Sequence, residues 1–564
     1  MKKFILLLTL LICVIISDPV LGADYPPPKI ICYIQGTPLD STKFGQEFCW
    51  VGDQNGDGSD DLLVSHDPDE KGRPSKADRV ELLYGGNPMD DQYDRFFTIP
   101  GLLYGCGRTL AYVGNLLSKE TRAVVLENYF WETSYQPSEH FVSICSIAPE
   151  WKESSEFIIT SHRPLKTIPA KGGHRFRPID FNGDGYHDLI LVEQLEFEDS
   201  SRIGRINTYY GGIDFDTLPD WSVVVPGMYD NYSVEVSSGY DVNGDGYGDF
   251  IIMYRYRDMN QPGLSAPRYS LFLGGHEPDT VHVLTWDSDH FPNRDMPSGF
   301  SLLPDINGDG YDEWGMYFIK WGGFTDGYYV FFGSDSLDLE PDLELMGNSS
   351  ITGGGGADLC GGDFNGDGYG DIVTSNGGGY NGEGQINITF GRPGLPKGKI
   401  YMDIRINGDS GEFLQFEQLG QKVGAVGDYN GDGVEDFVAY TYLPPKTGPS
   451  PAVLVLAGNK GWSVGVASST GLIPVDLTLQ VYPNPLNGEL KIKLALPVNG
   501  KVAVDFYDLN GRKVDSIADL AFPAGEHTLN WNVIDLPAGI YYLLLHYSTS
   551  TSERTISRKI VVLK

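Results

Sequence analysis

Six stretches of the chain repeat the pattern D-x-N-G-D-G-x-x-[DE], with the first residue at Asp53, Asp180, Asp241, Asp305, Asp363 and Asp428. Side chains at positions 1, 3 and 5 place oxygen atoms around a tight turn, and position 7 offers a backbone carbonyl. The carboxylate at position 9 closes the shell. Such an all-oxygen shell suits calcium, whereas magnesium requires a smaller octahedral cage and keeps more of its water. The pattern therefore predicts about six bound calcium ions.

The predicted ligands occupy equivalent positions in the six loops. They are Asp53, Asn55, Asp57, Ser59 and Asp61; Asp180, Asn182, Asp184, Tyr186 and Asp188; Asp241, Asn243, Asp245, Tyr247 and Asp249; Asp305, Asn307, Asp309, Tyr311 and Glu313; Asp363, Asn365, Asp367, Tyr369 and Asp371; Asp428, Asn430, Asp432, Val434 and Asp436. The side chain at position 7 is free to vary because only its carbonyl is expected to bind. Glu313 is one methylene longer than the Asp at position 9 of the other loops.

Other readings of these loops fit less well. Asn-Gly and Asp-Gly also occur in ordinary hairpin turns, but a turn does not need three carboxylates, which repel one another when no cation is bound. An EF-hand needs a bidentate Glu at position 12. That position holds Val64, Leu191, Ile252, Met316, Thr374 and Ala439. Dockerin-like loops precede helices at shorter intervals, whereas these precede β-rich runs, so a calcium-binding hairpin loop is favoured.

The charge balance agrees with cation binding. The chain has 564 residues and a formal net charge of −35, and positions 1, 5 and 9 of the six loops hold 18 of its 76 acidic residues. Six calcium ions would change the formal charge to −23. Nucleic acid is not an expected partner, because a chain of this sign repels phosphates.

The loops recur at intervals of 127, 61, 64, 58 and 65 residues, so one copy is missing near residue 115. There "VGNLLSKETRAVVL" (113–126) aligns with "VGDQNGDGSDDLLV" (51–64), but Asn115 replaces the leading Asp and Ala123 stands at position 9. Each unit has room for four short strands rich in aromatic and β-branched residues. Seven such units predict an all-β fold, a seven-bladed β-propeller over residues 24–470 whose second blade lacks the calcium motif.

The repeats resemble the FG-GAP repeats of the integrin α-subunit propeller, which also occur in bacteria as VCBS-like repeats. The form "FG…VGDxNGDGxxDLLV" of the first unit carries the resemblance, which covers about 440 residues. It implies that calcium stiffens hairpins on one face as a structural ion, that ligands are met elsewhere, and that the second unit binds no calcium.

The amino terminus predicts export. Lys2 and Lys3 precede a short apolar run, so residues 1–23 are expected to be a cleaved signal peptide, with a membrane anchor as the alternative. No later segment is apolar enough to span a bilayer. Five cysteines remain in the mature chain. A Cys106–Cys145 disulfide and buried free thiols are both open.

After a linker at 471–480, residues 481–564 contain some seven short strands, which predict a small Ig-like β-sandwich. The segment resembles the C-terminal sorting domain of type IX secretion substrates and the related domain of flagellar hook-capping proteins. Tyr482-Pro483-Asn484-Pro485, Asn510-Gly511-Arg512, Gly539-Ile540-Tyr541 and the basic end through Lys564 carry the resemblance. It implies a secreted or cell-surface protein that meets the outer-membrane secretion machinery. A carbohydrate-binding or spacer sandwich is the alternative.

No catalytic motif is present: the chain has no H-E-x-x-H, P-loop or nucleophile elbow. Three functions stay open, of which the first is favoured. The first is a non-catalytic adhesion or recognition module whose propeller face binds a protein or glycan. Its aromatic segments 322–332 and 377–385 could stack on sugars or fill blade cores. The others are a polysaccharide-degrading enzyme on a propeller scaffold and a purely structural envelope component.

Overall fold

The computed structural model describes residues 27–35, 43–67, 80–86, 94–97, 106–133, 136–148, 156–160, 167–168, 177–196, 202–225, 228–257, 265–278, 283–287, 296–319, 327–346, 357–377, 384–408, 417–443, 450–462, 478–482, 484, 486, 489–496, 500–509, 511–522, 525–532, 536–548 and 553–563. No helix among these residues has the length and apolar character needed to cross a membrane. The predicted signal peptide, residues 1–23, lies outside the described residues.

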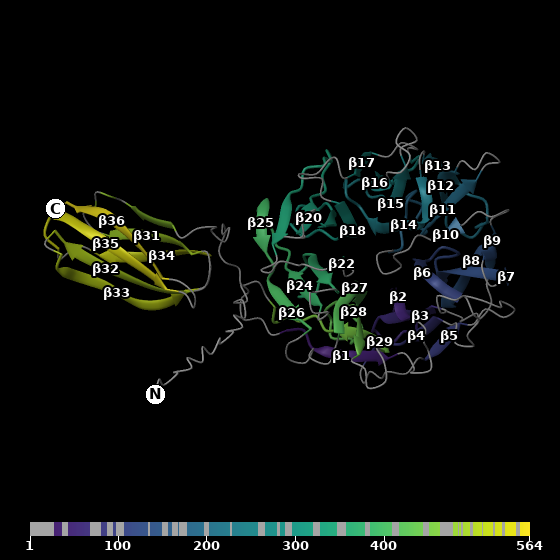
Figure 1. Cartoon of the computed structure of the whole chain (residues 1–564), viewed down its shortest axis with the longest axis horizontal. Coiled ribbons are helices and arrows are strands. Elements are labelled where there is room, and N and C mark those ends of the chain that lie inside the picture. The colour runs from purple at the N-terminus through teal and green to yellow at the C-terminus, as the bar shows by residue number, and fades with distance from the viewer. Residues whose placement is uncertain are drawn as a thin grey trace, which may run out of the picture.

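Seven sheets built mainly of antiparallel strands follow one another along the described part of residues 30–456 (Figure 1). In chain order they consist of β2 (Lys43–Gly52), β3 (Asp61–Asp67), β4 (Val80–Leu83) and β5 (Arg95–Phe97); β6 (Cys106–Gly114), β7 (Arg122–Thr133), β8 (Gln136–Ala148) and β9 (Phe157–Thr160); β10 (Thr167–Ile168), β11 (Leu189–Glu196), β12 (Arg202–Tyr209) and β13 (Trp221–Val225); β14 (Met228–Tyr240), β15 (Asp249–Arg257), β16 (Ser265–Phe272) and β17 (Leu284–Asp287); β18 (Met296–Leu303), β19 (Glu313–Ile319), β20 (Gly327–Phe331) and β21 (Leu343–Met346); β22 (Ala357–Gly362), β23 (Asp371–Asn376), β24 (Gln385–Thr389) and β26 (Ile404–Asn407); β27 (Glu417–Gly427), β28 (Asp436–Leu443), β29 (Ser450–Leu456) and β1 (Ile30–Gln35).

The sheets form a closed ring. The inner strands of neighbouring sheets pack together, with β14 against β18 and β22 against both β18 and β27. Strand β2 of the first sheet contacts both β6 of the second and β27 of the seventh, which joins the two ends of the ring. The predictions of an all-β fold and of a β-propeller are therefore confirmed.

Each blade packs between two others, so its inner strands are buried on both faces. In β23, for example, every residue is buried. The sequences of such strands do not alternate between apolar and polar residues as those of a half-exposed strand do. Their apolar runs follow the acidic loops directly. Each loop is thereby anchored to a buried strand at its carboxyl end.

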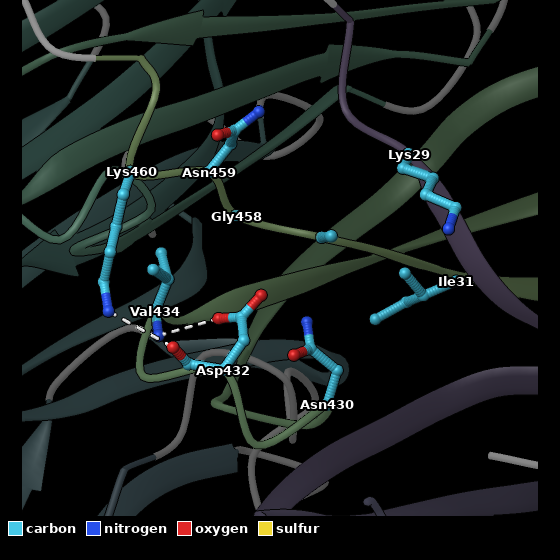
Figure 2. Close-up of a pocket in the computed structure, with 9 residues that line it drawn as sticks. Lys29, Ile31, Asn430, Asp432, Val434, Gly458, Asn459 and Lys460 are labelled. Carbon is cyan, nitrogen blue, oxygen red and sulfur yellow. Dashed lines mark hydrogen bonds between the residues drawn. The ribbon is translucent and has the colours of Figure 1, made fainter. Parts of the chain in front are cut away.

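The amino-terminal strand β1 completes the seventh blade. It pairs antiparallel with β29, with Tyr33 opposite Leu454. This pairing covers the edge that β29 would otherwise expose, and it joins the beginning and end of the propeller in one sheet. A cleft of about 600 Å³ lies at this junction, lined by residues of β1, of the loop at Asp428 and of the segment after β29 (Figure 2).

One strand crosses between blades. The connection between β24 and β26 contains β25 (Gly398–Tyr401), which adds to the fifth blade by pairing parallel with β21. Lys399 forms an ion pair of 3.2 Å with Glu344 beside this pairing. The fifth and sixth blades are thus joined at their outer edge.

The carboxyl-terminal segment forms two sheets around one apolar core. The first sheet contains β30 (Thr478–Tyr482), β31 (Glu489–Leu496) and β34 (Gly525–Asn532), and the second contains β33 (Lys513–Phe522), β32 (Gly500–Asp508), β35 (Gly539–Ser548) and β36 (Glu553–Val562). Strand β30 begins three residues inside the segment predicted as a linker. Asn484 of the Tyr-Pro-Asn-Pro motif accepts the Val561 N–H at 2.8 Å, which ties this motif to the final strand.

Of the two alternatives left open by the sequence, a Cys106–Cys145 disulfide and buried free thiols, the structure supports the second for Cys145, which is a buried free thiol. Cys106 pairs with Asn128, whereas Cys145 pairs with Val124 on the other side of β7. The two cysteines are therefore two strands apart, about 10 Å across the sheet, and are offset by four residues, about 13 Å along the strands. A disulfide requires Cα atoms about 4.4–6.8 Å apart.

The structure describes only part of the aromatic segments 322–332 and 377–385. Tyr328, Tyr329 and Phe331 are buried in blade cores, which confirms the core-filling interpretation for these three. Residues 322–326 and 378–383 lie outside the described residues.

Candidate metal centres

All six acidic loops share one backbone scaffold, held by the carboxylate at position 1. This carboxylate accepts the N–H of the Gly at position 6 in every loop, at 2.7–2.9 Å. In the third blade Asp180 also accepts the N–H groups of Gly183 and Asp184. The chain can turn this tightly because residues such as Gly185, at φ +84°, adopt the left-handed conformation that only Gly reaches without cost.

Position 5 is oriented in the same way in each loop. Its carboxylate accepts the N–H of position 7 at 2.8–3.0 Å. In the loop at Asp180, the Asn182 side chain donates to the second oxygen of Asp184 at 3.0 Å. In this loop the side chain at position 3 therefore turns toward the side chain at position 5.

Position 9 carries the most deeply buried acid of each loop. Asp61, Asp188, Asp249, Glu313, Asp371 and Asp436 are all 0% exposed. Backbone N–H groups hold most of them in place: Asp188, for example, accepts from Phe181 at 2.8 Å and from Gly211 at 2.9 Å. Each buried carboxylate therefore lies at the base of a loop whose exposed tip carries two more.

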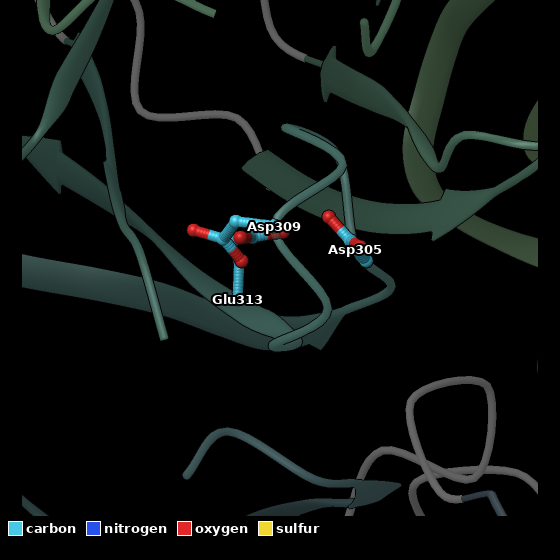
Figure 3. A group of neighbouring side chains, drawn as sticks. All are labelled: Asp305, Asp309 and Glu313. Carbon is cyan, nitrogen blue, oxygen red and sulfur yellow. The ribbon is translucent and has the colours of Figure 1, made fainter. Parts of the chain in front are cut away.

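The loop at Asp305 brings its carboxylates closest together (Figure 3). One oxygen each of Asp305, Asp309 and Glu313 lies within 4.8 Å of the other two, and this is the only such acidic group in the part of the chain that the structure describes. Glu313 also accepts from the Asn307 side chain at 2.9 Å. The longer side chain of Glu313 therefore still reaches the site.

These buried acids carry raised pKa values. Burial, reinforced by the nearby carboxylates of positions 1 and 5, raises the pKa of Asp188 to about 7 and that of Asp436 to about 8. The same causes raise the pKa of Glu313 to about 10. Backbone hydrogen bonds oppose the shifts without cancelling them. A cation bound among the three carboxylates would reverse this situation by favouring their ionised forms.

The donor set fits calcium. It consists of carboxylates, an amide oxygen and a backbone carbonyl, with no nitrogen or sulfur ligand, as hard cations require. In the loop at Asp363, the Oδ2 atom of Asp371 is buried and has no hydrogen-bond partner among the described residues. An orphaned carboxylate oxygen in this position is suited to a metal ion. The ligands in each loop would be the residues at positions 1, 3, 5, 7 and 9.

Residues at position 8 connect neighbouring loops, a role that the sequence does not reveal. Asp312 donates its N–H to the Asp241 carbonyl at 3.1 Å, and its Oδ2 accepts the Asp241 N–H at 2.8 Å. Asp60 binds Asp428 in the same two ways. Equivalent contacts join Glu435 to Asp363, Gly370 to Asp305 and Gly248 to Asp180. Five of the six loops are therefore hydrogen-bonded through position 1 to the next blade, and the loop at Asp53 is joined to the seventh blade through Asp60 at position 8.

The second blade joins this chain of contacts without a carboxylate shell. Asn115 donates its N–H to His187 Nδ1 at 3.1 Å and accepts the His187 N–H through its side chain at 2.7 Å. Lys119 stands where the other loops have the Asp of position 5, and Ala123 at position 9 is fully buried. This unit thus keeps the contact to the next loop while lacking the predicted ligands.

Two family models match the chain. Residues 480–563 match the secretion system C-terminal sorting domain, and residues 355–386 match the FG-GAP repeat. The second match contains β22, the loop at Asp363 and β23. No curated protein matches.

Several solved structures show weak likeness. PorZ, an essential bacterial surface component of the type-IX secretion system of Porphyromonas gingivalis, is 10% identical with a TM-score of 0.30, over 89% of this chain and 58% of that chain. The chain thus spans less than two thirds of that structure's length. The α-L-arabinanase of Penicillium chrysogenum is 12% identical with a TM-score of 0.31, over 62% and 98%. A tetra-tandem repeat of a large adhesion protein is 10% identical with a TM-score of 0.15, over 92% and 98%. None of the three bears on the function of this chain.

The family models confirm an FG-GAP repeat at residues 355–386 and a C-terminal sorting domain at residues 480–563. The sorting domain indicates export to the cell surface or secretion. The chain carries FG-GAP repeat sequence within its β-propeller and ends in a secretion system C-terminal sorting domain.

Proposed function

We propose that this protein is an exported calcium-binding β-propeller that acts as a non-catalytic recognition module for a protein or glycan. Its six acidic loops hold about six structural calcium ions, and its carboxyl-terminal domain engages type IX secretion machinery at the outer membrane. The observation that carries the calcium proposal is the fully buried acid at position 9 of every loop, placed below two further carboxylates. Three like charges so arranged are unfavourable without a cation.

The loops favour a structural role for the ion. Each is fixed by its own backbone hydrogen bonds and by contacts to the neighbouring blade. Calcium there would rigidify the ring and leave the chain's other surfaces for recognition.

One experiment tests both parts. The mature chain is freed of metal, titrated with calcium by calorimetry, and then passed over immobilised polysaccharides and surface proteins while soluble products are monitored. We expect about six ions per chain and calcium-dependent retention without new chain ends. Fewer than three ions would refute the calcium proposal, and release of cleaved polysaccharide would refute the non-catalytic one.

A further inference from the structure

The inner strand of the third blade makes the fewest backbone pairs in the part of the chain that the structure describes. Strand β10 has only two residues, both paired with β11. One further bridge joins Ile179 to Asp188 beside the loop. The inner strands of the other six blades have six to thirteen residues. Contacts other than this ladder must therefore help to hold the third blade in the ring.

Arg177, three residues before Asp180, reaches from the third blade to three others. Its guanidinium carbon lies over the ring of Trp50 in the first blade and over that of Tyr240 in the fourth, at 5.6 Å from each centroid. Its Nη2 atom donates to the Gly361 carbonyl of the sixth blade at 3.4 Å. A guanidinium within about 6 Å of an aromatic face makes a cation–π contact. One side chain therefore joins four blades.

These contacts lie at the centre of the ring. The first, fourth and sixth blades are not neighbours of one another, so their residues can surround one guanidinium only there. Figure 1 shows the inner strands β2, β14 and β22 around this centre. Trp50, Tyr240 and Gly361 each stand one to three residues before the Asp at position 1 of their loop. The site is therefore at the loop end of the inner strands.

Nearby acidic groups favour the charged form of this arginine. Burial acts to lower the pKa of Arg177, but Tyr240 and the carboxylates of Glu435 and Asp60 raise it above its ordinary value. Both carboxylates stand at position 8 of their loops and are held by hydrogen bonds to Asp363 and Asp428 of neighbouring loops. The site thus combines two aromatic faces with negative charge, and both features suit a guanidinium.

The arginine and one of its aromatic partners are fixed in place. The Ser238 hydroxyl donates to the Arg177 carbonyl at 2.9 Å. A Cβ at Gly239 would come within 2.7 Å of the Arg177 Cβ, so the fourth blade can approach this closely only with Gly at that position. Trp50 packs edge-to-face against Tyr112, at 5.6 Å between ring centroids. Little conformational freedom is therefore lost when the guanidinium meets the indole.

We propose that the centre of the ring is a guanidinium-binding site that the chain fills with its own Arg177, and that this contact ties the third blade to the first, fourth and sixth. Trp50 and Tyr240 recognise the planar cation by their faces, and the Gly361 carbonyl accepts one of its N–H groups. None of these four residues is a predicted calcium ligand. The role is thus separate from that of the calcium loops and from the ligand that the propeller recognises.

The test is chemical rescue of Arg177→Ala, measured by scanning calorimetry of the calcium-loaded mature chain. We expect the variant to lower the melting temperature of the propeller by about 4 °C, the loss of two desolvated cation–π contacts in a domain of this size. The transition of the carboxyl-terminal sandwich should not change, since it has its own core. Ethylguanidinium is the group that this substitution removes, and at millimolar concentration it should restore most of the loss.

The controls separate recognition of the guanidinium from a general effect of charge. Ethylammonium should restore little, and Arg177→Lys should recover only part of the stability, because an ammonium group lacks the planar fork. Arg95→Ala removes an exposed arginine from the outer strand of the first blade and should shift the melting temperature by less than about 1 °C.

Three results would each overturn the inference: an unchanged melting temperature for Arg177→Ala, equal rescue by ethylammonium, or equal stabilisation of the unsubstituted chain by ethylguanidinium. If Arg177→Ala does not fold unaided, its refolding yield is compared with each of the two additives present. A higher yield with ethylguanidinium supports the site, and equal yields refute it.

Discussion

Withdrawal of calcium should destabilise the propeller far more than the carboxyl-terminal sandwich. A ligand at 100 times its Kd stabilises the folded state by about 2.7 kcal/mol per site, so six sites contribute about 16 kcal/mol. Unfolding entropy is about 2.1 cal/mol/K per residue, or about 0.9 kcal/mol/K for the roughly 430 residues from β1 to β29. Loss of all six ions should therefore lower the propeller's melting temperature by about 18 °C.

The raised pKa values of the buried acids give an independent value, of similar size, for the free energy lost when calcium is removed. The pKa of Asp188 rises from 3.8 to about 7 on burial. Since each unit corresponds to about 1.4 kcal/mol, ionising this one group in a metal-free loop costs roughly 4 kcal/mol. One such group per loop is enough to account for the expected loss.

The assay is differential scanning calorimetry of the mature chain at pH 7.5, with calcium and after chelation. Added magnesium should restore little of the stability, because the loops present a large, flexible oxygen shell. The sandwich contains none of the loops and has its own core, so its transition serves as an internal control. A shift of the propeller transition below about 3 °C, the amount expected for a single site, would refute the reasoning.

Two further predictions concern the loops. Without calcium, the melting temperature of the propeller should fall as pH rises from about 4 to 8, because the folded-state pKa values of Asp188 and Asp436, about 7 and 8, lie above the unfolded-state value. Excess calcium should abolish this fall, and a metal-free melting temperature that is constant or rises with pH would contradict the prediction. Asp312→Ala removes the side-chain hydrogen bond to Asp241 and should weaken calcium binding at one site of the neighbouring blade about tenfold in a calcium titration. Asp335→Ala, at an exposed position, is the control and should not weaken it. Equal titrations of the two variants would show that neighbouring loops are independent.

Sequence alone revealed the parts of this fold that repeat. The period of the acidic pattern and the apolar runs behind it predict the propeller, because every blade needs a buried strand after its loop. The missing unit at Asn115 is also visible in the spacing, since Val113 and Val124 keep the flanking strand pattern.

What the sequence does not reveal depends on contacts between distant residues. Strand β1 completes a sheet with a segment more than 400 residues away, and no local pattern identifies that partner. Strand β25 pairs with the preceding blade, although its four residues look like any short strand. The loop pattern assigns no role to Asp60 and Asp312, whereas in the structure each is hydrogen-bonded to the backbone of an adjacent blade. The state of Cys145 stayed open in the sequence for the same reason, since spacing does not determine register.

The second blade shows why the acids at positions 1, 5 and 9 of a loop are present together or absent together. A carboxylate buried at position 9 is tolerable only when a cation offsets it, so a unit without acids at positions 1 and 5 would be destabilised by keeping one there. In this unit Ala123 replaces that carboxylate and belongs to an apolar core cluster of the second to fourth blades that also contains Leu116. The junction to the first blade contains an edge-to-face contact of Trp50 with Tyr112, at 5.6 Å between ring centroids. Apolar packing thus stabilises the second blade locally, as we propose that calcium stabilises the six other blades. Restoring Asp at position 9 alone should destabilise this blade, because the new charge would be buried without its partners.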